Sequence, residues 1–108
     1  MISETGVVYR LQFDRDALNE WHALDGSVKA ILKKQLAKRL VSPHVVADAL
    51  SGSLHGCYKI KLRKQGYRLV YRVEDDRLVV IVIAVGRRDK SAVYEMATKR
   101  MSIKGGAS

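Results

Sequence analysis

The clearest pattern in this chain is an alternation of charged and apolar side chains over residues 57–72, at the period of a β-strand. Side chains two apart share one face of a strand, so Lys59, Lys61 and Arg63 project together. The glycine-containing turn at 64–66 then returns the chain into a second strand. The pattern predicts a hairpin with one cationic face, made of strands 57–63 and 67–73.

Other hydrophobic patterns predict the rest of the fold. Alternation over 7–13 indicates a first strand, and apolar steps of three and four residues indicate a short helix around Trp21 and a longer one over 27–40. Residues 78–85 are apolar on both faces, which is typical of a central strand. With a final helix from Ala92, the order βααβββα predicts an α+β domain. We expect a mainly antiparallel sheet with helices packed on one face and a cationic face opposite.

The composition fits one small domain with a polyanionic partner. With 108 residues, 47% of them apolar, the chain can form a single core. We place this domain in residues 1–100 and expect a disordered tail over 101–108. The net charge of +9 favours binding to phosphate backbones, because neutralised phosphates release their counterions. Six cations and no acid fall in residues 57–72, so the hairpin carries much of this charge.

The sequence argues against several other functional classes. Cys57 is the only cysteine, so no internal disulfide is possible, and three scattered histidines offer no zinc-binding spacing. No apolar run reaches the roughly 20 residues that span a bilayer, and we see no signal peptide. We therefore expect a cytoplasmic protein that needs no membrane, metal or cofactor.

Cations on strands do not by themselves make a site, because lysine and arginine also cover solvated strand faces. Arg68 on the second strand and Arg88 after the third would add to Lys59 and Lys61, and such crowding is costly unless an anion binds. Tyr94 in the last helix is also ambiguous. Packing is its simpler interpretation, but cations lower the pKa of a neighbouring phenol, and a phenolate can act as a general base. The residues alone leave both questions open.

Four motifs in this part of the chain resemble the RelE toxins of bacterial type II toxin–antitoxin modules. They are CYKIKLR at 57–63, GYRLVY at 66–71, VGxR at 85–88 and SxVY at 91–94. The resemblance runs over residues 9–100 and implies a small RelE-like domain. It also implies a ribosome-dependent endonuclease that cuts messenger RNA in the ribosomal A site. By motif, the catalytic positions of the family fall on Lys59, Lys61, Arg68, Arg88 and Tyr94.

The resemblance gives these residues roles in RNA cleavage. RNA carries its own nucleophile, the 2′-hydroxyl, so the enzyme must supply proton transfer and charge stabilisation. Tyr94 would deprotonate this hydroxyl, and the strand cations would stabilise the charge of the transition state. Either Arg88 or Lys61 would protonate the leaving oxygen, although arginine is a weak acid. Further RNA contacts are expected from the other cations of the region, Arg63, Lys64, Arg72, Arg87 and Lys90.

The resemblance also implies partners. These are a cognate RelB-like antitoxin that holds the toxin inactive, the 70S ribosome with messenger RNA and 16S rRNA, and operator DNA reached only through the antitoxin. Two alternatives stay open: a ParE-like toxin that inhibits gyrase, and a noncatalytic module that binds RNA or the ribosome. The catalytic motif residues argue against the first, and an absence of RNA cleavage would favour the second.

Overall fold

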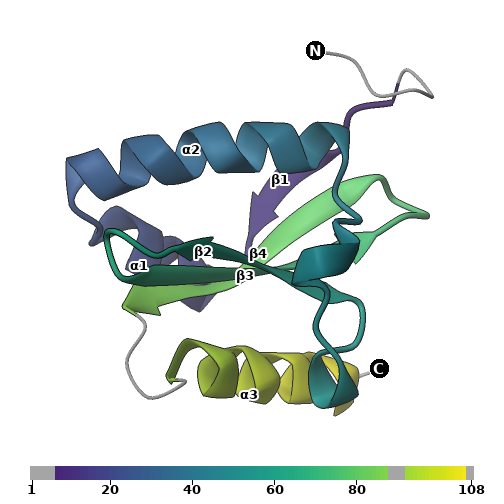
Figure 1. The fold of residues 1–108 in the computed structure, drawn as a ribbon. Coiled ribbons are helices and arrows are strands. Elements are labelled where there is room, and N and C mark those ends of the chain that lie inside the picture. Colours follow the sequence, from purple (N-terminus) through teal and green to yellow (C-terminus); the bar gives the residue numbers. More distant parts are fainter. Residues whose placement is uncertain (1–6, 88–91, 107–108) are drawn as a thin grey trace.

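The computed structural model describes residues 7–87 and 92–106, which form a mixed four-stranded sheet with helices on both faces (Figure 1). The strands are β1 (Arg10–Phe13), β2 (Cys57–Leu62), β3 (Tyr67–Glu74) and β4 (Val79–Arg87). The helices are α1 (Arg15–His22), α2 (Gly26–Val41) and α3 (Ala92–Gly106). Two short 3-10 turns, η1 (Val46–Asp48) and η2 (Gly52–Leu54), connect α2 to β2. The predicted α+β class is confirmed.

The apolar strand β4 lies inside the sheet, as its sequence predicts. The strand order is β1-β4-β3-β2, with β1 parallel to β4 and the other neighbours antiparallel. Most residues of β4 are buried, because side chains on both of its faces are covered. The register places Lys61 opposite Arg68 and Arg68 opposite Gly86. These three positions therefore form one row across β2, β3 and β4.

Two hydrophobic cores lie on opposite faces of the sheet. The helices α1 and α2 contribute Trp21 and Leu32 to the first core, together with Ile60 of β2. The helix α3 contributes Val93 and Ala97 to the second core, and Figure 1 shows α3 and α2 on either side of the sheet. Our expectation that all helices pack on one face was therefore wrong. Its cause lies in β4, whose two apolar faces each need a covering layer.

Short-range sequence signals set the helix boundaries. The Asp14 carboxylate accepts a hydrogen bond from the Asp16 N–H at 3.0 Å and caps α1. The Asp25 carboxylate accepts from the Ser27 N–H at 3.2 Å and caps α2 in the same way. The helix α2 ends shortly before Pro43, because the residue preceding a proline is kept out of the helical region.

The last helix is longer than the sequence suggests. It runs to Gly106, so it includes residues 101–106 of the segment 101–108, which we expected to be a disordered tail. Its buried residues Val93 and Ala97 lie near its start and attach it to the sheet. None of the helices in the described ranges is long and apolar enough to cross a membrane.

Candidate active site

The hairpin of β2 and β3 brings the candidate cations together on the face of the sheet that carries α3. Lys59 and Lys61 alternate with the buried Ile60, which packs in the α1–α2 core, so both lysines point to the other side. Arg68 lies directly across from Lys61, and cross-strand partners share a face. Three of the five predicted catalytic residues therefore share one surface.

The crowding of these cations lowers the pKa of Lys61. The charge of Lys59 is the main cause, with a further contribution from desolvation of the ammonium group. Arg68 and Arg63 add to the effect, whereas the carboxylate of Asp48 opposes it. Neighbouring positive charges disfavour the protonated form of lysine. A bound phosphate would relieve this repulsion, which favours an anion-binding surface over a merely solvated one.

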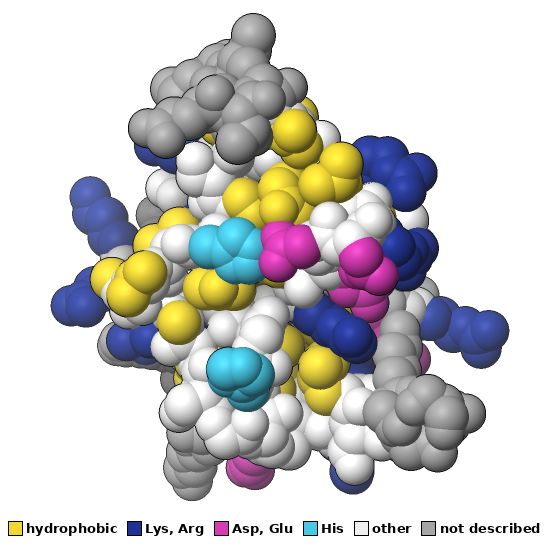
Figure 2. Space-filling view, turned by 90° about the vertical axis from the view of Figure 1, so that its right-hand side faces the viewer, with side chains coloured by type: hydrophobic (Ala, Val, Ile, Leu, Met, Phe, Trp, Pro, Cys, Tyr) yellow, Lys and Arg dark blue, Asp and Glu magenta, His cyan; other side chains and the backbone are white. Residues whose placement is uncertain are grey.

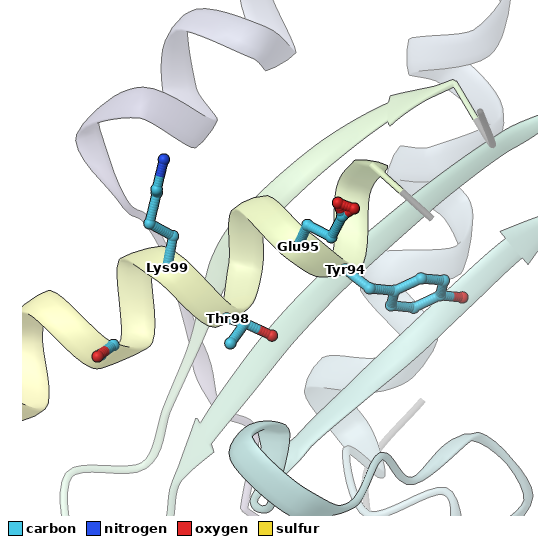
Figure 3. Close-up of a pocket in the computed structure, with 5 residues that line it drawn as sticks. Tyr94, Glu95, Thr98 and Lys99 are labelled. Atoms are coloured by element: carbon cyan, nitrogen blue, oxygen red, sulfur yellow. The ribbon is translucent and has the colours of Figure 1, made fainter. Parts of the chain in front are cut away.

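The helix α3 places Tyr94 beside this surface. Val93 and Ala97 attach the helix to the sheet, and Tyr94 packs at the edge of the same core while staying partly exposed. Figure 3 shows its ring leaving the helix with the phenol oxygen pointing away from the helix axis. A hollow of about 500 Å³ adjoins the ring along α3, lined by Tyr94, Glu95, Thr98, Lys99 and Ser102. Tyr94 therefore lines this hollow and is partly exposed to solvent.

Three further RNA-contact candidates lie on the hairpin itself. Arg63 and Lys64 are exposed in the turn that follows β2. Arg72 lies toward the other end of β3, where its guanidinium is 3.4 Å from the Glu74 carboxylate. Its position is four residues from Arg68 along the strand, which corresponds to roughly 13 Å. Arg63 and Lys64 therefore extend the cationic cluster, and Arg72 lies apart from it.

Arg87 lies on the opposite face of the sheet. Its guanidinium carbon stands 5.5 Å from the centre of the Tyr67 ring, and Tyr67 packs against the α1–α2 core. Side chains alternate along β4, so Gly86 rather than Arg87 lies beside Arg68. The structure therefore does not bring Arg87 to the other cations. Two more candidates lie outside the described residues, Arg88 and Lys90.

A polar network from α2 reaches β2, and the sequence analysis missed it. The Arg39 guanidinium donates hydrogen bonds to the Asp48 carboxylate (2.7 Å), the Tyr71 hydroxyl (2.8 Å) and the Lys59 carbonyl oxygen (3.2 Å). The side chains of Arg39 and Asp48 are only 12% and 28% exposed. One signal for this contact was present, because Asp48 is the only acid in residues 26–73.

A second polar network lies on the face shown in Figure 2, where a histidine and an acidic side chain touch among hydrophobic ones. The Asp75 carboxylate accepts a hydrogen bond from the Tyr9 hydroxyl at 2.6 Å and lies 2.7 Å from His44 Nε2. The other ring nitrogen of His44 is 2.7 Å from the Tyr58 hydroxyl. Hydrogen bonds from Tyr9 and His44 lower the pKa of Asp75, and the bond to Asp75 raises the pKa of Tyr9 to about 12. The network joins segments that are distant in sequence.

Other kinds of site find no support in the described part of the chain. Within residues 7–87 and 92–106, no three His, Cys, Asp or Glu side chains gather in a way that could hold a metal ion. Cys57 is fully buried, and burial raises the pKa of its thiol to about 11. Because the thiolate is the reactive form, Cys57 acts as a core residue.

Comparison with known proteins leads to the same family as the motifs. Residues 11–92 match the family described as ParE toxin of type II toxin-antitoxin system, parDE. The chain is 50% identical over 95 residues to the mRNA interferase toxin RelE of Escherichia coli, a match that covers 88% of this chain and 99% of the relative. The mRNA interferase RelE of Shigella flexneri matches with the same identity and coverage.

Solved structures agree with the sequence matches. An E. coli toxin RelE mutant in the free state matches with a TM-score of 0.78 at 50% identity, over 86% of this chain and 97% of that chain. A toxin RelE mutant in complex with an antitoxin RelBc peptide matches with a TM-score of 0.73 at 50% identity, over 83% and 94%. This chain therefore belongs to the RelE toxins, within the RelE/ParE superfamily of type II toxin–antitoxin systems.

Proposed function

We propose that this protein is the toxin of a type II toxin–antitoxin module and cuts messenger RNA in the ribosomal A site. The observation that carries the proposal is the cluster of Lys59, Lys61 and Arg68 on the face of the sheet that also carries Tyr94. The E. coli relative that is 50% identical is named an mRNA interferase toxin. A cationic surface beside a phenol suits RNA, which carries a phosphate next to a 2′-hydroxyl.

Cleavage proceeds in this proposal by attack of the 2′-oxygen on the adjacent phosphorus. Tyr94 acts as the general base and takes the proton of the 2′-hydroxyl, a bond forms from the 2′-oxygen to phosphorus, and the bond to the 5′-oxygen breaks. Lys59 and Arg68 stabilise the charge that develops on the phosphoryl oxygens. Lys61 protonates the leaving 5′-oxygen, since its lowered pKa makes it a stronger acid than an ordinary lysine. The products are a 2′,3′-cyclic phosphate and a 5′-hydroxyl.

The partners follow from the same basic surface. A ribosome loaded with messenger RNA presents phosphates of both the messenger and the 16S rRNA. Affinity should therefore fall steeply with salt, because the release of counterions into a more concentrated salt solution gains less free energy. A cognate RelB-like antitoxin would cover the surface with an acidic or amphipathic segment, and the antitoxin would carry the complex to operator DNA. An E. coli RelE mutant has been solved with an antitoxin RelBc peptide, which supports such a partner. We place the protein in the cytoplasm, where it meets ribosomes.

Mapping RNA ends in a translating extract tests the proposal. Addition of the purified protein should create new 5′ ends inside codons that occupy the A site, and the same messenger without ribosomes should be cut much more slowly. A chain that leaves translated messengers intact, at concentrations where it binds ribosomes, would contradict the proposal and favour a noncatalytic ribosome-binding module.

Gyrase inhibition is the second candidate, because the matching family description names ParE. A supercoiling assay with purified gyrase separates the two functions. Our proposal predicts normal supercoiling at toxin concentrations that cut messenger RNA completely. Blocked supercoiling together with intact messenger would identify a ParE-like toxin instead.

A further inference from the structure

We propose that Arg39 is a positioning residue, which binds Asp48 and so keeps this carboxylate away from the lysines of β2. The inference rests on the proposed function, because it concerns lysines that meet the scissile phosphate. Arg39 itself lies on α2, and its contact with Lys59 is to the backbone carbonyl rather than to the ammonium group. It therefore acts through other residues.

The contacts of Arg39 fix its guanidinium from several sides. One nitrogen donates to the Tyr71 hydroxyl at 2.8 Å and to the Lys59 carbonyl at 3.2 Å. The other terminal nitrogen donates to Asp48 Oδ2 at 2.7 Å. The Tyr71 ring also lies 5.6 Å from the guanidinium carbon. Because a guanidinium is a rigid planar fork, the bonds to β2 and β3 on one side determine where the carboxylate is held on the other.

Asp48 lies close enough to the cationic cluster to affect it. It ends η1, and the next residue, Ala49, forms a bridge to Tyr58 of β2. Its charge acts on the ammonium group of Lys61 and raises the pKa of that group. A carboxylate released toward the lysines would compete with the substrate phosphate for their charge and would bind the proton of Lys61 more tightly. The ion pair with Arg39 opposes both effects.

The charged groups that act on Lys61 come from four parts of the fold. They are Lys59 on the same strand, Arg68 on β3, Arg63 in the turn and Asp48 on η1. Asp48 is the acid among them, and its charge opposes the three cations with the smallest of these effects, so its pairing with Arg39 helps to keep the pKa of Lys61 low. Loss of Arg39 should therefore make Lys61 a weaker acid, and loss of the Asp48 charge should make it a stronger one.

A double-mutant cycle with Arg39→Met and Asp48→Asn tests the proposal. Single-turnover cleavage is measured on saturating programmed ribosomes. We expect Arg39→Met to slow cleavage about tenfold, a part of the 10²–10⁴ that general acid–base catalysis typically contributes. Asp48→Asn should cut at least as fast as the wild type, and the double variant should recover the Asp48→Asn rate. A double variant as slow as Arg39→Met would show that Arg39 merely supports the fold, and would overturn the inference.

The acidity of Lys61 in the free protein provides a second readout that does not depend on cleavage. An NMR titration of the lysine side chains should give Lys61 a higher pKa in Arg39→Met and a lower pKa in Asp48→Asn than in the wild type. Equal values in all three proteins would refute the role of Arg39, whereas an inactive wild type would refute only the proposed function. If Arg39→Met does not fold, Arg39→Lys replaces it. The pKa of Lys61 should again rise in this variant, but by less, because an ammonium cannot hold all three partners at once.

Discussion

Glu20 of α1 and Arg100 of α3 form a two-pronged ion pair, with two guanidinium nitrogens 2.9 Å from the two carboxylate oxygens. The same side chains bind the backbone of β4. Glu20 accepts from the Val85 N–H at 3.1 Å, and Arg100 donates to the Ile83 carbonyl at 2.8 Å. Because β1 pairs with β4 only as far as Val82, the ion pair occupies the edge of β4 that β1 leaves open. It also links helices from opposite faces of the sheet.

Arg100→Met should destabilise the protein by about 2–4 kcal/mol, because it leaves the largely buried carboxylate of Glu20 without its partner. The Arg100 and Glu20 side chains are 11% and 25% exposed, so solvent can replace little of the lost interaction. Urea unfolding should show a lower midpoint with an unchanged m-value. The matched control is Arg77→Met, whose 52% exposed side chain pairs with Glu74 and should cost less than about 1 kcal/mol. If the two variants lose the same free energy of unfolding, the Glu20–Arg100 pair contributes no more to stability than an exposed surface pair does.

The cationic hairpin could be predicted because its information is local. Alternation fixes the faces of Lys59 and Lys61, and the short turn fixes the register that sets Arg68 opposite Lys61. Alternation does not, however, give the face of the sheet on which each side chain of β4 lies. Its register shifts beside Val70, so the consecutive residues Ile83 and Ala84 both pack in the second core. Such a bulge changes the alternation of faces, and an apolar run gives no sign of it.

The Arg39 network and the place of α3 depend on contacts between distant parts of the chain. Arg39 reaches Lys59 across 20 residues and Tyr71 across 32. In the sequence it is one of several cations on a long helix, where solvent exposure is the usual outcome. The position of α3 likewise follows from apolar side chains of β4, η2 and α3 that meet only after folding, such as Ile83, Leu54 and Val93.

Arg68→Ala should abolish most messenger cleavage without unfolding the protein. The side chain is only partly buried, and its neighbours in β3 keep their packing. Loss of one preorganised charge stabiliser typically costs about 10²–10³ in rate. Arg87→Ala is the matched control, since it removes the same charge from the opposite face of the sheet, and it should cut at nearly the wild-type rate. If a folded Arg68→Ala protein cuts as fast as Arg87→Ala, Arg68 does not stabilise the phosphate in the transition state.

Tyr94→Phe should lose most of the cleavage rate with little change in thermal stability. The substitution keeps the ring at the edge of the second core but removes the oxygen that would accept the 2′-proton, and general base catalysis is typically worth about 10²–10⁴ in rate. Single-turnover cleavage and thermal unfolding of the same preparation check both halves of the prediction. Tyr67→Phe, on the other face of the sheet, should behave like the wild type. A fully active Tyr94→Phe enzyme would leave Tyr94 as a packing residue.

Tyr9 should make the stability of the protein decline at alkaline pH. Its hydrogen bond to Asp75 is the main reason that its pKa is raised to about 12, whereas a tyrosine in an unfolded chain has a pKa of about 10. The folded state therefore holds this proton more tightly. The resulting stabilisation is complete below about pH 10 and is lost as the pH rises toward about 12. Urea unfolding across this range should show that the difference between wild type and Tyr9→Phe shrinks, and a constant difference would contradict the linkage.

Lys61→Arg should separate binding from proton donation. Arginine keeps the positive charge but has a pKa above about 12, so the variant should bind programmed ribosomes with wild-type affinity and salt dependence. If Lys61 protonates the leaving oxygen, cleavage at neutral pH should still slow by about 10² or more.

The wild-type rate should also fall at alkaline pH, because only the protonated lysine can donate. Since Lys59 and its neighbours lower the pKa of Lys61, this fall should begin below the pH expected for an ordinary lysine, whose pKa is about 10.4. Lys61→Arg should lack it. Lys59→Arg is the control, because Lys59 is needed only for its charge. This variant should keep the fall of the cleavage rate at alkaline pH, and it should cut faster than Lys61→Arg. If Lys61→Arg instead cuts as fast as the wild type, another group must donate the proton to the leaving oxygen. An arginine at position 61 is too weak an acid to do so.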